Sequence, residues 1–192
     1  WMHSGYPLMA FIEASPEFVD LDYIFENSIW GPFHEIGHNH QAEAWLLPGT
    51  TETTCNLWST YMTENILQMS LEDNPTLAPL AREERILAYF AGGKDFYNDW
   101  NVWVALDTYL QLKERFGWDF YKTIFPLYRE MPETQWPTTD QGRIDLWVIK
   151  SSEVAQHDLS DFYLAWGFPI TQNALDTIAH LPDWADHPML DY

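Results

Sequence analysis

The sequence predicts a mainly α-helical fold. Apolar residues recur at helical spacing along most of the chain, and the clearest case is WNVWVALDTYLQLKERF at residues 100–116. Proline, glycine and asparagine divide the rest into segments of helical length. The chain has 192 residues and is 46% hydrophobic and 17% aromatic, enough for a real core. We therefore expect one globular unit over residues 1–192, with strand content confined to its N-terminus.

The first half of the chain contains an extended segment and three helices. Residues 1–13 mix aromatic and apolar side chains around Gly5-Tyr6-Pro7, which indicates an extended segment with a kink. Ser15, Pro16 and Glu17 supply an N-cap, a first-turn proline and a first-turn acid, so a short helix is expected to about Asn27. Breakers and caps then predict two longer helices, over residues 32–44 and 51–69.

The second half is expected to be helical throughout. A helix over residues 82–90 ends at Gly92-Gly93, and the amphipathic helix over residues 100–116 stops at Gly117. Further helices are expected over residues 119–131, 141–156, 158–168 and 171–181. No repeat or linker divides the chain.

Composition narrows the possible partners and leaves the compartment open. The net charge of −20 disfavours nucleic acids and anionic membrane surfaces, and no apolar run is long enough to insert into a membrane. Cys55 is the only cysteine, so an internal disulfide and a multi-cysteine zinc site are excluded. The chain begins abruptly at Trp1-Met2-His3, so we expect a fragment of a longer protein. Oligomeric state is not predicted.

The segment HEIGH at residues 34–38 predicts a metal site. His34 and His38 are four residues apart, so on a helix both imidazoles point from one face. Zinc accepts imidazole nitrogen at about 2.0–2.1 Å, and catalytic zinc sites have three protein ligands and one open position. Glu52, in the first turn of the next expected helix, is the predicted third ligand. The alternative motif HExxHxxGxxH fails, because Gln41 and Ala44 occupy its remaining positions.

Glu35 is the predicted general base. It follows His34 by one residue, which places its carboxylate beside the metal rather than on it. There it can accept a proton from water whose pKa zinc lowers toward about 7, as the water attacks a polarised carbonyl. It can later protonate the leaving amine. Because neutral imidazoles bind zinc, metal affinity is expected to fall as the pH drops through about 6.

Several nearby residues have alternative roles. Asn56 is one helical turn from Glu52, and either orients a ligand histidine or is an ordinary polar residue. Cys55 is more simply a small buried residue than a ligand. His40 is about 200° round the helix from His38, so we expect it either to support a ligand from outside the metal site or to be structural. The sequence does not choose the oxyanion donor, for which Tyr6, Tyr61, His40 and His157 are candidates.

These residues match a known family pattern. WGPFHEIGHNHQ, followed after thirteen residues by the glutamate of TTETTCNLWS, resembles the M60-like (enhancin-type) peptidase domain. The match includes GHNHQ at residues 37–41 and Glu-x-Thr-x-Asn at Glu52, Thr54 and Asn56. HSGYP at residues 3–7, the segment at 101–118 and DLSDFYLAWGFPIT at 158–171 extend it over nearly the whole chain.

The resemblance implies a gluzincin catalytic core with zinc as cofactor, a C-terminal helical subdomain and an N-terminal edge-strand segment beside the cleft. It also implies a protein or glycoprotein substrate, because family members are similar in cutting mucins and other O-glycosylated proteins. An extracellular or cell-surface location would follow from such a substrate. Local basic groups such as Arg82, Arg85 and Arg143 are candidates for contacts with acidic glycans.

Two other functions remain open. TTETTCNLW and the NVWVALDTYLQL helix also look like the animal channel-associated factors that share this domain, in which the second metal histidine is typically absent. His38 is present here, which favours an enzyme. The cysteine at position 55, in contrast, resembles the animal channel-associated factors more. The alternatives are therefore a non-catalytic interaction domain of the same fold and a purely structural zinc site, which requires a fourth protein ligand.

Overall fold

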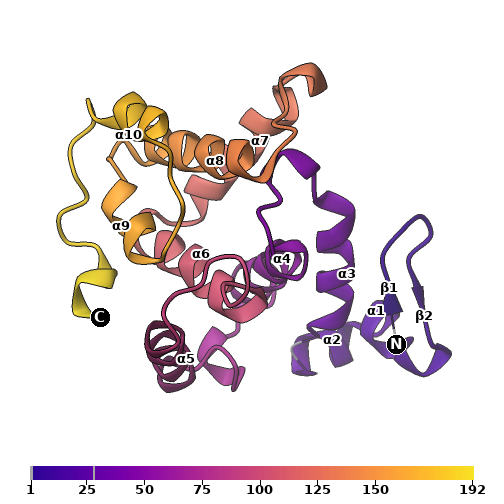
Figure 1. Ribbon diagram of the computed structural model, residues 1–192. Coiled ribbons are helices and arrows are strands. Elements are labelled where there is room, and N and C mark those ends of the chain that lie inside the picture. Colours follow the sequence, from indigo (N-terminus) through magenta and orange to yellow (C-terminus); the bar gives the residue numbers. More distant parts are fainter. Residues whose placement is uncertain (1, 28) are drawn as a thin grey trace.

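The computed structural model describes residues 2–27 and 29–192, and helices make up most of that range after an N-terminal pair of strands (Figure 1). The mainly α fold class is thereby confirmed, and so is the short N-terminal strand segment. None of the helices in the described residues combines the length and apolarity needed to cross a bilayer. The helices and strands are β1 (Met2–His3), β2 (Met9–Ala10), α1 (Pro16–Val19), α2 (Leu21–Asn27), α3 (Gly31–His40), α4 (Thr51–Asn65), α5 (Pro79–Ala91), α6 (Val102–Phe116), α7 (Trp118–Glu130), α8 (Asp140–Ala155), α9 (Ser160–Ala165) and α10 (Gln172–Ile178).

The N-terminal segment is a hairpin rather than one kinked strand. β1 and β2 pair antiparallel, with Met2 opposite Ala10 and His3 opposite Met9. The turn between them is tied to the end of α3, because Gly5 N–H donates to Asn39 Oδ1 at 2.9 Å and Asn39 Nδ2 donates to the Gly5 carbonyl at 3.1 Å. The hairpin is thereby fixed beside the helix that carries HEIGH.

Helix α6 lies at the centre of the main hydrophobic core. Leu106, Tyr109 and Leu110 on its apolar stripe are buried, as the sequence predicts, and Trp103 is partly buried. Helices α4, α5 and α7 pack against α6, and α8 packs on α7 (Figure 1). Helix α4 therefore lies between α6 and α3, and it packs on both of them (Figure 1).

Four predicted helices are shorter than expected. Of these, α9 covers Ser160–Ala165 of the expected 158–168 and α10 covers Gln172–Ile178 of the expected 171–181, and the other two are α3 and α4. The helix expected over residues 32–44 ends at His40, and Gln41 is extended with ψ of 149°. The helix expected over residues 51–69 ends at Asn65, where Met69 N–H bonds to the Thr63 carbonyl across a turn and Gln68 has φ of 57°. Helix α3 ends at His40 because the side chain of Gln41 is hydrogen-bonded to α4. The sequence pattern alone does not show this contact.

A glycine allows α3 and α4 to cross closely. A Cβ atom built at Gly37 would lie 2.8 Å from both the Cα and the carbonyl oxygen of Cys55. These are backbone atoms, so no side-chain rotation can relieve the contact. The crossing that brings HEIGH onto α4 therefore requires glycine at position 37.

We expect Gly37→Ala to destabilise the fold although alanine is the better helix former. The helix-propensity gain of about 1 kcal/mol is smaller than the overpacking penalty, which reaches about 3 kcal/mol when backbones must separate. Thermal unfolding should show a lower Tm. The control is Gly92→Ala at the end of α5, where φ is −73° and the added carbon makes ordinary contacts at 3.4 Å. An unchanged Tm for Gly37→Ala would contradict the close crossing.

Candidate metal centre

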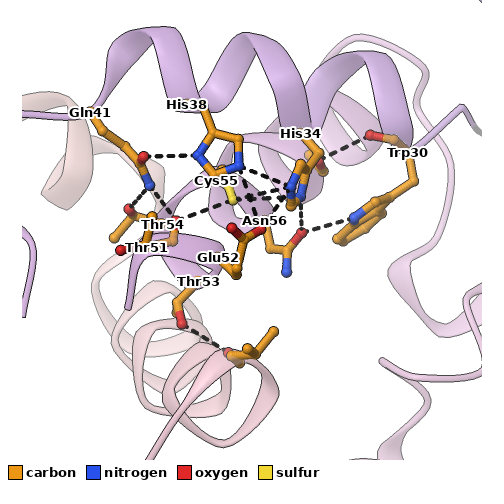
Figure 2. A network of polar contacts seen from close by, with 12 residues as sticks. Trp30, His34, His38, Gln41, Thr51, Glu52, Thr53, Thr54, Cys55 and Asn56 are labelled. Carbon is orange, nitrogen blue, oxygen red and sulfur yellow. Dashed lines mark hydrogen bonds and ion pairs between the residues drawn. The ribbon is translucent and has the colours of Figure 1, made fainter. Parts of the chain in front are cut away.

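Helices α3 and α4 bring His34, His38 and Glu52 together (Figure 2). The Nε2 atoms of the two histidines are 3.1 Å apart, and Glu52 Oε2 lies 3.1 Å from His34 Nε2 and 3.4 Å from His38 Nε2. Ligands in a tetrahedron with bonds of about 2.0–2.1 Å are separated by about 3.3 Å. The three atoms therefore fit one face of a zinc tetrahedron.

Hydrogen bonds fix the tautomer of His34. The Trp30 indole N–H, which can only donate, bonds to Asn56 Oδ1 at 2.9 Å, and this identifies the amide oxygen. His34 Nδ1 lies 2.7 Å from the same oxygen and must therefore carry the proton. The Nε2 atom is left with a free lone pair directed toward His38 and Glu52. Asn56 thus has the contact expected of a residue that orients a metal ligand.

Hydrogen bonds to Gln41 fix the tautomer of His38 in the same way. The Nε2 group of Gln41 donates to the Thr51 carbonyl, which can only accept, and to Thr54 Oγ1 at 2.7 Å. The opposite atom, Oε1, lies 2.9 Å from His38 Nδ1, so this ring nitrogen also carries the proton. Sequence reasoning did not find this role of Gln41 or that of Trp30. Trp30 and Gln41 lie on either side of the HEIGH segment, which could have marked them as candidates. Their contacts, however, depend on how α3 crosses α4.

The arrangement of these three atoms calls for a cation. When both rings are neutral and carry their proton on Nδ1, two imidazole lone pairs and a carboxylate oxygen face one another with no donor hydrogen between them. Their mutual repulsion is relieved by a shared positive ion. The side chain of Glu52 is 52% exposed, against 20% for His34 and 15% for His38, so the centre is open to solvent on the Glu52 side.

Cys55 lies against the His34 ring and not in a ligand position. Its Sγ atom is 3.5 Å from Nδ1 and 3.7 Å from Nε2, which places the sulfur over the ring face. A sulfur sharing an ion with Nε2 would lie beyond the ring edge, about 5 Å from Nδ1. The thiol donates instead to the Thr51 carbonyl at 3.4 Å, and burial, followed by Glu52 and Glu35, raises its pKa well above the usual range. In this geometry Cys55 does not supply the fourth ligand that a structural zinc site requires.

The predicted base and oxyanion donors have different surroundings. Glu35 follows His34 on α3 and is half-buried, outside the three converging atoms. Of the oxyanion candidates, His40 stacks on Trp58, with ring centroids 4.6 Å apart, and His157 contacts the Ala155 carbonyl after α8. Tyr61 lies on the face of α4 opposite Glu52. Tyr6, exposed in the hairpin turn beside Gly5, stays a prediction.

The basic groups suggested for acidic glycans are already neutralised. Arg82 and Arg85 bind the buried carboxylate of Asp107, at 2.9 Å and 2.7 Å. Arg143 is paired with Glu43 and Asp140. The suggestion that Arg82, Arg85 or Arg143 contacts acidic glycans is therefore not supported.

We expect Gln41→Leu to weaken zinc binding by about 10–100-fold, because removing a partner that holds a ligand histidine typically has this effect. Leucine fills a similar volume but leaves His38 Nδ1 without an acceptor. Competition with a chromophoric chelator measures the change. Gln172→Leu, on the exposed face of α10, is the matched control. Equal affinities for the two variants would show that Gln41 does not orient His38.

Comparison with known proteins agrees with the geometry. The family described as Peptidase M60, enhancin and enhancin-like matches residues 1–167. The chain is 43% identical to TRPM8 channel-associated factor 2 of Homo sapiens and 42% identical to the TRPM8 channel-associated factor homolog of Danio rerio. Both matches cover the whole chain but 21% of the relative, so the chain spans about a fifth of the length of these proteins.

A solved structure has the same fold. The crystal structure of a functionally unknown conserved protein mutant from Bacillus anthracis str. Ames superposes with a TM-score of 0.81 at 25% identity, over 97% of this chain and 38% of that one. The family match covers most of the chain, and the animal relatives align with it from end to end. The chain belongs to the Peptidase M60, enhancin and enhancin-like family.

Proposed function

We propose that this protein is a zinc-dependent endopeptidase that hydrolyses peptide bonds in mucin-like O-glycosylated proteins. The observation that supports it most is the convergence of His34 Nε2, His38 Nε2 and Glu52 Oε2 within 3.4 Å, with both tautomers set for metal binding. Membership of the M60 family supports the reaction class. The glycoprotein substrate rests on the resemblance alone.

In this proposal His34, His38 and Glu52 hold the zinc ion. When bound, zinc supplies a Lewis acid that polarises the scissile carbonyl and makes water acidic enough to react near neutral pH. Glu35 accepts the proton of the attacking water and delivers it to the leaving amine. Asn56 and Gln41 keep the two imidazoles in one tautomer and one orientation. The open side of Glu52 admits the substrate.

Cleavage of a mucin tests the proposal. The natural chain, loaded with zinc, is incubated with a mucin-type glycoprotein and with the same protein after enzymatic removal of its O-glycans, and new N-termini are identified by mass spectrometry. We expect cleavage of the glycosylated form that stops when a chelator removes the metal. A zinc-loaded protein that cleaves neither form would reject the peptidase. Equal cleavage of both would reject only the glycoprotein preference.

A second candidate is a non-catalytic interaction domain. It is favoured by the 40–43% identity to relatives whose names describe association with the TRPM8 channel. In that case the surface of the domain binds a membrane protein partner and the metal centre is dispensable. A well-folded protein that contains no zinc, cleaves no substrate and binds a TRPM8-type channel would support this candidate over the peptidase.

A further inference from the structure

A second site is present on the side of α4 that faces away from the metal centre. A pocket of about 410 Å³ lies between α4 and α7, within the range of small-molecule sites. We call it the aromatic pocket. Its walls and rim include Trp58, Tyr61, Trp118, Phe125, Lys122 and Arg129.

The aromatic pocket is separate from the metal centre. At 100° per residue, Leu57 and Tyr61 lie roughly 140° and 180° round α4 from Glu52. None of the three metal-binding residues lines it. The proposed peptidase function therefore neither explains this pocket nor depends on it.

Ring contacts give the pocket flat, apolar walls. Trp58 stacks on His40 with an interplanar angle of 26°, and Tyr61 meets Trp118 edge to face at 5.1 Å. Such walls favour a flat apolar group, because ring faces and edges contact it over a large area. A sugar carries hydroxyl groups around the edge of its ring, and most of them would find no hydrogen-bond partner on these apolar walls.

The charge at the rim is positive although the chain carries −20. Among residues 2–27 and 29–192, the basic side chains other than Lys94 and Arg129 lie within 4 Å of a carboxylate oxygen. Arg129 donates from Nη2 to the His40 carbonyl at 2.9 Å, which leaves its other N–H groups available. Lys122 is 3.3 Å from Asp119, but both side chains are exposed, so solvent screens that pair.

The other charged groups near the rim do not reverse this sign. Glu64, which accepts from Trp118 Nε1 at 2.8 Å, is neutralised by Lys113 at 2.7 Å. His40, whose ring stacks on Trp58, adds no negative charge to the rim. Arg129 and Lys122 would therefore repel a cationic aromatic ligand.

We propose that the aromatic pocket binds a small aromatic carboxylate, with its ring between the walls from α4 and α7 and its carboxylate on Arg129. Guanidinium and carboxylate groups match as a two-point pair, which suits the N–H groups that Arg129 has free. Lys122 adds a second positive charge at the same rim. The ligand touches α4 and the end of α3, the two helices that carry the metal-binding residues.

Two isosteric probes test this proposal, 2-naphthoate and the uncharged 2-naphthamide. Their binding to the complete natural chain is measured by titration calorimetry at low ionic strength. We expect naphthoate to bind about tenfold more tightly than naphthamide, the effect of one partly exposed charge-assisted pair. Arg129→Gln should remove this preference and leave the affinity for naphthamide unchanged. Trp58→Ala should weaken both probes.

The matched control is Arg143→Gln, which removes the same charge at a distant, already paired site. It should keep the tenfold preference, and circular dichroism confirms that each variant is folded. Three results would overturn the proposal: no binding of either probe, equal binding of both probes, or a preference that survives Arg129→Gln.

Discussion

Glu35→Gln is expected to abolish peptide hydrolysis while zinc remains bound. Glu35 is outside the three converging atoms, so the variant keeps all metal-binding groups. Glutamine has the same shape but cannot accept a proton at neutral pH, and a general base contributes about 10²–10⁴-fold to the rate. We expect kcat/KM to fall by that factor and the zinc content to stay at one per chain.

Glu26→Gln is the control for this experiment, because Glu26 is an exposed carboxylate on α2 and makes the same change of charge. Its activity should equal that of the unmodified protein. Retained hydrolysis in Glu35→Gln would reject the role of Glu35 without touching the metal site. Loss of zinc together with activity would instead place Glu35 among the ligands.

Glu52→Ala is expected to lower zinc affinity by at least about a hundredfold. Loss of a partner that only orients a ligand already weakens binding by about 10–100-fold, and Glu52 is placed to bind directly. The variant leaves two imidazole lone pairs 3.1 Å apart without the carboxylate that completes the face. Activity at low free zinc should disappear with the metal. The affinity is measured by competition with a chelator of known affinity.

Glu43→Ala provides the control for the loss of a carboxylate. Glu43 lies in the connection between α3 and α4, just before the helix that carries Glu52, and its partner is Arg143 at 3.4 Å. The control variant should keep its zinc. Unchanged affinity in Glu52→Ala would mean that the site is formed by other groups, with Cys55 as the first alternative because its sulfur is the nearest.

Local patterns predicted the elements that depend on local physics. The helix that carries His34 and His38 follows from their spacing, and the central helix α6 follows from its apolar stripe and the stop at Gly117. The convergence of Glu52 on the histidines is also present in the structure, although the sequence shows only that a turn precedes it. The hydrophobic periodicity and the helix-breaking residues were sufficient to predict these features.

Contacts between distant segments were not predictable in this way. The end of α3 at His40 depends on Gln41 reaching α4, and the hairpin depends on the pairing of Met2 with Ala10. Trp30 contacts Asn56 across 26 positions of the sequence. The aromatic pocket joins α4 to α7. Each of these depends on how separate segments pack or pair in space, which hydrophobic periodicity does not encode.

X-ray absorption at the zinc edge of the purified natural chain tests the central claim most directly, because it reports metal content and ligand type together. The account predicts one zinc per chain with nitrogen and oxygen neighbours at about 2.0–2.1 Å and no sulfur at about 2.3 Å. A chain that binds no zinc, or a spectrum with a sulfur neighbour from Cys55, would contradict an open three-ligand centre built from His34, His38 and Glu52.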